Sequence, residues 1–160
     1  MSEGRPVYFV GHSAGGLAAL LASTQSDDVA GHLGLDTVDS AGLGLAAASS
    51  LAVPSAALLG MSEACNSGGN AVGVYAADSD AQVLRLPGAD HCDFESPTDA
   101  LCTAFCASGS GPEPATSQTI IALTTAWLVW QAGLEADGEA WWSGEGLDEL
   151  LSLGTVEVLQ

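Results

Sequence analysis

The chain has 160 residues, a length that suits one domain, and 48% of them are hydrophobic, enough to fill a core. It carries 20 acidic residues against two arginines, so its formal net charge is −18. Nucleic acids and anionic membrane surfaces would repel such a protein, and neither is expected as a partner.

The cysteines form an even set, which an oxidising compartment would convert into two disulfides. The sequence leaves all three pairings open for Cys65, Cys92, Cys102 and Cys106. We therefore expect a secreted or periplasmic protein whose export signal lies upstream, because residues 1–10 do not resemble one. The longest apolar stretch, Ile120–Trp130, is shorter than the roughly 20 residues of a membrane span, so stable membrane insertion is not expected.

Short β-branched and apolar runs alternate with helical or looped segments along the first half of the chain. Val7–Val10 predicts a strand, Gly11 ends it, and Ala14–Ser23 predicts a helix. Two further strands are expected through His32–Leu35 and over Val53–Leu59.

The next segments continue this alternation. A loop is expected at Asn66–Asn70, a short helix at Val72–Ala77 and a fourth strand at Gln82–Leu86. The pattern predicts an α/β fold with a mostly parallel sheet flanked by helices. Functional groups of such sheets gather at the carboxyl ends of the strands.

The last third of the chain is predicted to be helical. A helix follows Pro97, and residues 108–116 form a Gly/Ser/Pro-rich, flexible linker. Apolar residues then recur at spacings of three and four over Thr119–Leu134, which predicts a helix with one buried face. The tail, residues 138–160, is expected to pack against the rest of a single domain that spans residues 1–160.

A G-x-S-x-G pentapeptide, Gly11 to Gly15, stands between the first strand and the first helix. This context predicts a nucleophile elbow, a strained turn that exposes the hydroxyl of Ser13. Gly11, Gly15 and Gly16 are expected to give the backbone the room that this turn needs. The backbone N–H of Ala14, at the start of the helix, is the predicted oxyanion donor.

A serine needs a general base, and His91 lies in a loop just after the fourth strand, where that base is expected. The other two histidines are interpreted as structural. His12 is expected to point away from the nucleophile, although its place in the elbow makes it the candidate substrate-binding residue. His32 is placed at the start of a strand, opposite the catalytic end.

The acid that orients His91 is left open among three residues: Asp36, Asp39 and Glu63. All of them lie between the serine and the histidine, the chain order typical of α/β-hydrolases. The position of Asp36 at the end of the second strand favours it. A zinc site formed by His91, Cys92, Cys102 and Cys106 is the less favoured use of the cysteines, because the spacing is not C-x-x-C.

Several of these segments resemble the chlorophyllase and polyester-hydrolase (cutinase-like) branch of the α/β-hydrolase superfamily. The elbow at 11–16 resembles the family's nucleophile motif, and residues 34–38 resemble the chlorophyllase segment that carries its catalytic Asp, here Asp36. Residues 88–94 resemble the run that contains its catalytic histidine. In polyester hydrolases the acid follows the next strand instead, which corresponds to Glu63.

The resemblance implies a serine hydrolase that cleaves small-molecule, lipid or polymer esters through an acyl-serine intermediate and needs no cofactor. It covers only the second half of that fold, including its closing helix and tail. The strand at Val7–Val10 is therefore expected to be an unpaired edge that allows self-association. Two other hypotheses are an inactive remnant that serves as a binding module, and a cysteine-rich metal module.

Overall fold

Strands and helices alternate along the first half of the chain, and helices dominate the second, as the sequence predicts. The computed structural model describes residues 6–106 and 114–160. The elements are β1 (Val7–His12), α1 (Ala14–Ser23), β2 (Val29–Leu35), α2 (Leu43–Ala48), β3 (Ser55–Leu59), α3 (Ala71–Tyr75), β4 (Gln82–Arg85), η1 (His91–Phe94), α4 (Ala100–Phe105), α5 (Pro114–Gln131), η2 (Ala136–Glu139), α6 (Ala140–Ser143), α7 (Glu145–Ser152) and β5 (Glu157–Val158).

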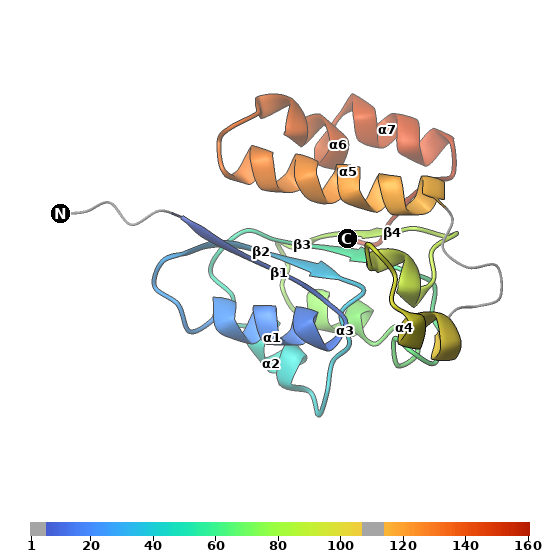
Figure 1. The fold of residues 1–160 in the computed structure, drawn as a ribbon. Helices are drawn as coiled ribbons and strands as arrows, with labels where there is room; N and C mark the ends of the chain where they lie inside the picture. The colour runs from blue at the N-terminus through green and yellow to red at the C-terminus, as the bar shows by residue number, and fades with distance from the viewer. Residues whose placement is uncertain (1–5, 107–113) are drawn as a thin grey trace.

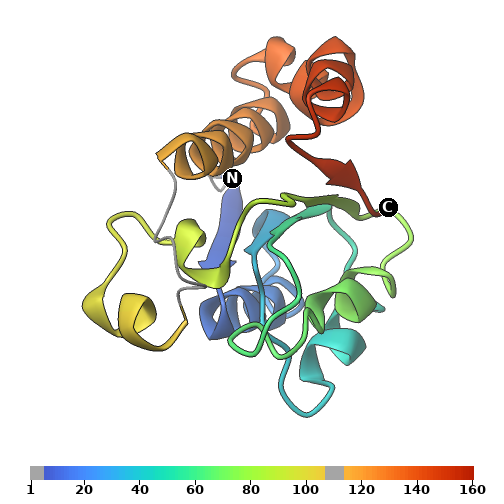
Figure 2. The ribbon, with the colours of Figure 1, turned by 90° about the vertical axis from the view of Figure 1, so that its right-hand side faces the viewer.

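The five strands form one sheet in the order β1-β2-β3-β4-β5. Strands β1 to β4 are parallel, and β5 pairs antiparallel with β4. Helices α1, α2 and α3 cover one face of this sheet, and α5, α6 and α7 cover the other (Figures 1 and 2). The prediction of an α/β fold with a mostly parallel sheet is confirmed, while α2 and β5 were not predicted. In the described part of the chain β1 is an edge strand.

Each face of the sheet has its own hydrophobic core, because side chains alternate along a strand. On β3, Ala56 and Leu58 face the core beneath α5, whereas Ala57 and Leu59 face the core beneath α1 to α3. All four side chains are buried. This burial on both faces is why β3 reads in the sequence as a continuous apolar run.

Helix α5 packs across the sheet through Ile120, Leu123 and Trp127, the face that the 3–4 spacing predicts. Its close approach to β2 requires a glycine at position 31, where a Cβ would lie 2.8 Å from the Trp127 ring. The helix departs from its predicted range at both ends. It ends at Gln131, near the left-handed Gly133, so Leu134 lies outside the buried face and is 73% exposed.

Of the linker predicted at 108–116, residues 108–113 lie outside the described residues. Residues 114–116, however, form the first turn of α5 and are not a linker. The tail packs as expected: Trp142 is buried and its indole N–H donates to the Leu123 carbonyl at 3.0 Å. No helix in the ranges 6–106 and 114–160 combines the length and apolar character that a membrane span requires.

We predict that Trp127→Ala lowers the free energy of unfolding by about 3–5 kcal/mol, because Trp127 is fully buried between α5 and the sheet. Urea titration followed by far-UV circular dichroism measures the change. Trp141→Ala is the matched control: Trp141 is 42% exposed, so its loss is expected to be less than half as large. Equal losses would mean that the α5 core does not carry the fold.

Candidate active site

Three side chains from separate loops meet at the carboxyl end of the parallel strands. Ser13 follows β1, Asp36 follows β2 and His91 follows β4. The His91 Nε2 atom lies 2.9 Å from the Ser13 hydroxyl oxygen, and the His91 Nδ1 atom lies 2.6 Å from Asp36 Oδ2. The structure thus joins the three residues in one hydrogen-bonded series, although up to 78 positions separate them in the sequence.

Ser13 occupies a sharp turn between β1 and α1, with φ 57° and ψ −128°. A non-glycine residue in this region stores roughly 1–3 kcal/mol of strain. Small neighbours permit the turn: a Cβ on Gly11 would collide with the Gly15 carbonyl, and one on Gly16 with the Thr37 hydroxyl. The expectation for Gly15 itself is wrong, since its missing side chain faces open space.

The loop after β2 is tied directly to this turn. The backbone N–H of Ser13 donates to the Leu35 carbonyl at 3.0 Å, and that of Val38 donates to the Ser13 carbonyl at 3.1 Å. Asp36, which lies between Leu35 and Val38 in the chain, also has a positive φ of 39°. These bonds hold the hydroxyl-bearing turn and the carboxylate-bearing turn in one fixed relation.

The Asp36 carboxylate is 2% exposed and has several partners besides His91. The Gly60 N–H donates to Oδ1 at 3.0 Å, and the Asn66 amide lies 3.3 and 3.2 Å from the two oxygens. A buried carboxylate needs such donors to offset its desolvation. In the sequence Asn66 is only one residue of a predicted loop. Its full burial against the Asp36 carboxylate is visible only in the structure.

The other two acid candidates lie elsewhere. Glu63 accepts a hydrogen bond from the backbone N–H of His91 at 2.7 Å, so it contacts the main chain of that residue and is not the partner of its ring. Asp39 accepts from the Gly44 N–H at 2.7 Å, at the start of α2. Of the three carboxylates, Asp36 is therefore the one placed against the imidazole.

The hydrogen-bond geometry indicates which nitrogen of His91 carries the proton. An ionised Asp36 only accepts, so we assign the proton of the neutral ring to Nδ1. The Nε2 atom then has its lone pair directed at the Ser13 hydroxyl, the arrangement required to remove the hydroxyl proton. The N–H of Ala14 is the first of α1, a position where an α-helix offers no i−4 carbonyl as acceptor.

The expectation that His12 points away from the nucleophile is wrong. Its ring packs against that of His91, with the ring centroids 4.5 Å apart, and its Nε2 atom lies 3.1 Å from the His91 carbonyl oxygen. The pKa of His12 is lowered mainly by burial and, to a smaller extent, by the nearby His91. The side chain borders the same cleft as Ser13.

His32 is also not where the sequence placed it. It lies within β2, fully buried, and its Nε2 atom is 3.0 Å from the Tyr75 hydroxyl, which is also 3.0 Å from Thr37 Oγ1. Burial lowers the pKa of His32 from 6.5 to about 4 and raises that of Tyr75. His32 is thus a neutral structural residue beneath the site.

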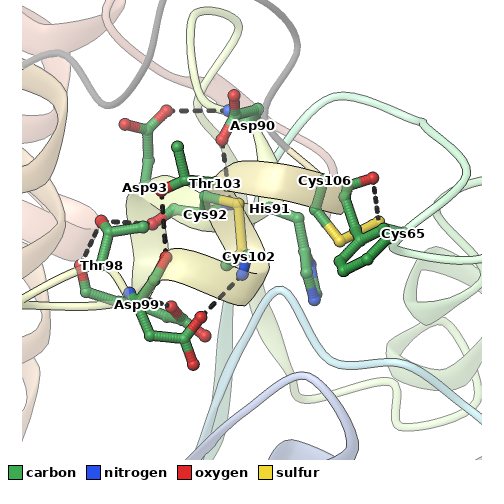
Figure 3. The surroundings of a disulfide bond; sticks show 12 residues. Cys65, Asp90, His91, Cys92, Asp93, Thr98, Asp99, Cys102, Thr103 and Cys106 are labelled. Carbon is green, nitrogen blue, oxygen red and sulfur yellow. Dashed lines mark hydrogen bonds between the residues drawn. A yellow bond between two sulfur atoms is a disulfide. The ribbon is translucent and has the colours of Figure 1, made fainter.

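Two disulfides attach α4 and the residue directly after it to the loops around the site, and His91 lies between the two bonds (Figure 3). Cys92 pairs with Cys102, and Cys65 pairs with Cys106. This pairing was open in the sequence, and it leaves no thiolate for the zinc site considered above. In the described ranges no group of His, Cys, Asp and Glu is arranged to hold a metal ion.

A shallow cleft of about 300 Å³ opens onto Ser13 and His91. Most of its walls come from the segment after His91 and from α4. Besides Ser13 and His91, the cleft is lined by His12, Glu95, Asp99, Leu101, Cys102, Phe105 and Cys106. The partly exposed Ser13 therefore faces solvent through a cleft that one cysteine of each disulfide borders, while His91 beside it is only 4% exposed.

No protein-family model matches the sequence, and no curated protein matches it either. The geometry of the site is therefore the main indication of what this protein does.

The buried His32 predicts a pH dependence of stability. Its pKa is about 4 in the folded chain and 6.5 when unfolded, so the unfolded state binds the additional proton as the pH falls from 6.5 to 4. Between pH 7 and pH 5 we expect the free energy of unfolding to fall by about 2 kcal/mol more in the unmodified protein than in the His32→Gln variant. Urea titration of both proteins at each pH measures the difference. A difference between the two proteins that stays the same at pH 7 and pH 5 would show that the fold does not lower the pKa of His32.

Proposed function

We propose that this protein is a serine hydrolase of the α/β-hydrolase fold that cleaves carboxylic esters. The observation that carries the proposal is the series Ser13–His91–Asp36, in which a strained, partly exposed serine contacts a histidine that contacts a buried carboxylate. Ester hydrolysis by this constellation is known on several unrelated folds, so the geometry counts for more than the sequence.

In the proposed mechanism His91 Nε2 removes the proton of the Ser13 hydroxyl as its oxygen attacks the ester carbonyl. The N–H of Ala14 donates to the resulting oxyanion. The protonated His91 gives its proton to the departing alcohol, which leaves Ser13 acylated. A water molecule, deprotonated by His91, then attacks the acyl group, and the carboxylic acid and the free serine are released. No step needs a metal or an organic cofactor.

Asp36 is the proposed acid of the triad. Its carboxylate keeps the His91 proton on Nδ1 and stabilises the imidazolium that forms in each half-reaction. Glu63 supports the same histidine through the main chain, and Asn66 orients the Asp36 carboxylate. Both are proposed as positioning residues.

The proposed substrates are small-molecule, lipid or polymer esters, as the resemblance to the chlorophyllase and cutinase-like branch implies. His12 is the proposed substrate-binding residue, supported by its place in the wall of the cleft. The two disulfides support a role in an oxidising compartment, and secretion or a periplasmic location is proposed on that basis. The edge strand β1, with half-exposed Val7 and Val10, is the proposed surface for self-association.

The first test is labelling with a fluorophosphonate probe followed by peptide mass spectrometry. We expect the label on Ser13, because activation by His91 makes this hydroxyl nucleophilic. Ser13→Ala and His91→Gln should abolish labelling, while Ser49→Ala, an exposed serine elsewhere, should leave it intact. Folded protein that takes no label would overturn the proposal and favour a non-catalytic binding module.

A second prediction separates the two acids beside His91. Asp36→Asn should lower kcat by about 10⁴-fold, because the asparagine amide favours the wrong tautomer of the histidine. Glu63→Gln should cost less than about tenfold, since its amide oxygen still accepts from the His91 N–H. Hydrolysis of p-nitrophenyl butyrate measures both. The assignment fails if the Glu63 variant shows the larger loss.

A further inference from the structure

We propose that the Ser13 cleft selects esters by charge: it favours a substrate with a cationic, alkyl-bearing group over a neutral one of the same shape, and it rejects an anionic one. This inference rests on the proposed function and names the substrate class of the same site. It is carried by three observations on the walls of the cleft.

The first observation is an apolar wall. Leu101 and Phe105, on α4, border the cleft with Ser13 and are 68% and 80% exposed. Large apolar side chains with this much exposure beside a reactive serine are available to cover the alkyl part of a substrate. The Cys92–Cys102 and Cys65–Cys106 disulfides hold this wall to the loops that carry His91 and Asn66.

The second observation is a pair of carboxylates on the same walls, Glu95 and Asp99. Their positions are held: Glu95 Oε2 accepts from the Asp99 N–H at 3.1 Å, and Asp99 Oδ1 accepts from the Cys102 N–H at 2.7 Å. Glu95 also lies 3.7 Å from the ring of His12, which packs on His91. Two fixed negative charges therefore stand close to the reacting groups.

The third observation is the lack of compensating positive charge. In the described ranges the only Lys or Arg side chain is Arg85, and it pairs with Glu157 at 3.7 Å on β4 and β5. The chain as a whole carries −18. A cation that approaches Ser13 is therefore attracted both by the overall field and by the two local carboxylates, whereas an anion is repelled by both.

Apolar cover together with fixed negative charge suits a trimethylammonium group, whose methyl groups are apolar and whose charge is diffuse. A neutral alkyl ester has the first of these interactions and lacks the second. A carboxylate-bearing ester can place its methylene chain on the same wall, but its charge is repelled by Glu95 and Asp99. The expected order of kcat/KM is cationic, then neutral, then anionic.

The test uses three p-nitrophenyl esters that share a four-methylene acyl chain and differ only at its end: trimethylammonium, tert-butyl or carboxylate. At low ionic strength we expect kcat/KM for the cationic ester to exceed that for the anionic ester by at least about a hundredfold, with the neutral ester between them. In 0.5 M NaCl the ratio should shrink several-fold, because salt screens the charges.

Two matched double variants separate the local carboxylates from the overall charge. Glu95→Gln/Asp99→Asn should reduce the cation-to-anion ratio at least fivefold. Asp148→Asn/Glu149→Gln, on the remote helix α7, removes the same charge and should change the ratio less than twofold. Equal effects of the two variants would overturn the proposal.

The outcomes also separate this inference from the proposed function. Equal kcat/KM for the three esters, with turnover abolished by Ser13→Ala, would overturn charge selection and leave the serine hydrolase standing. No turnover of any ester, together with no fluorophosphonate label on folded protein, would remove both.

Discussion

The hydrogen bond between Asp36 and His91 is the interaction on which the rest of the site depends. Both side chains are almost fully buried, and an ionised carboxylate in that position is tolerated only when donors surround it. The Gly60 N–H and the Asn66 amide supply those donors, so the loop after β3 must fold against Asp36. The same loop brings Glu63 to the backbone of His91. One buried charge thus organises three loops.

The disulfides extend this organisation to the wall of the cleft. Helix α4 has six residues, of which only Cys102 is buried, so apolar packing contributes little to holding it in place. A cross-link restrains such a segment by limiting the conformations of the unfolded chain. One disulfide joins Cys102 of α4 to the residue after His91, and the other joins Cys106, directly after α4, to the residue before Asn66. The cleft wall is therefore fixed relative to the loops that carry His91 and Asn66.

The charge balance affects stability and recognition together. With one Arg–carboxylate pair in the described ranges, ion pairs contribute little to the fold, and the two apolar cores and the disulfides carry it. Apart from the buried Asp36, Asp90 and Asp93, the acidic residues of the described ranges are at least partly exposed, where water and salt screen their charge. Near Ser13 two of these acidic groups, Glu95 and Asp99, are held at the walls of the cleft.

The sequence by itself determined the four parallel strands, the helices α1, α3, α4 and α5, the turn around Ser13 and the position of His91 after β4. These features depend on local periodicity and on glycine spacing, which a single sequence contains. The tertiary structure decided what depends on distant contacts: that Asp36 meets the His91 ring while Glu63 meets its backbone, that Asn66 supports the acid, that His12 packs on His91 and which cysteines pair. The physical reason is that parallel strands bring together loops many residues apart, and residue types alone do not encode those distances.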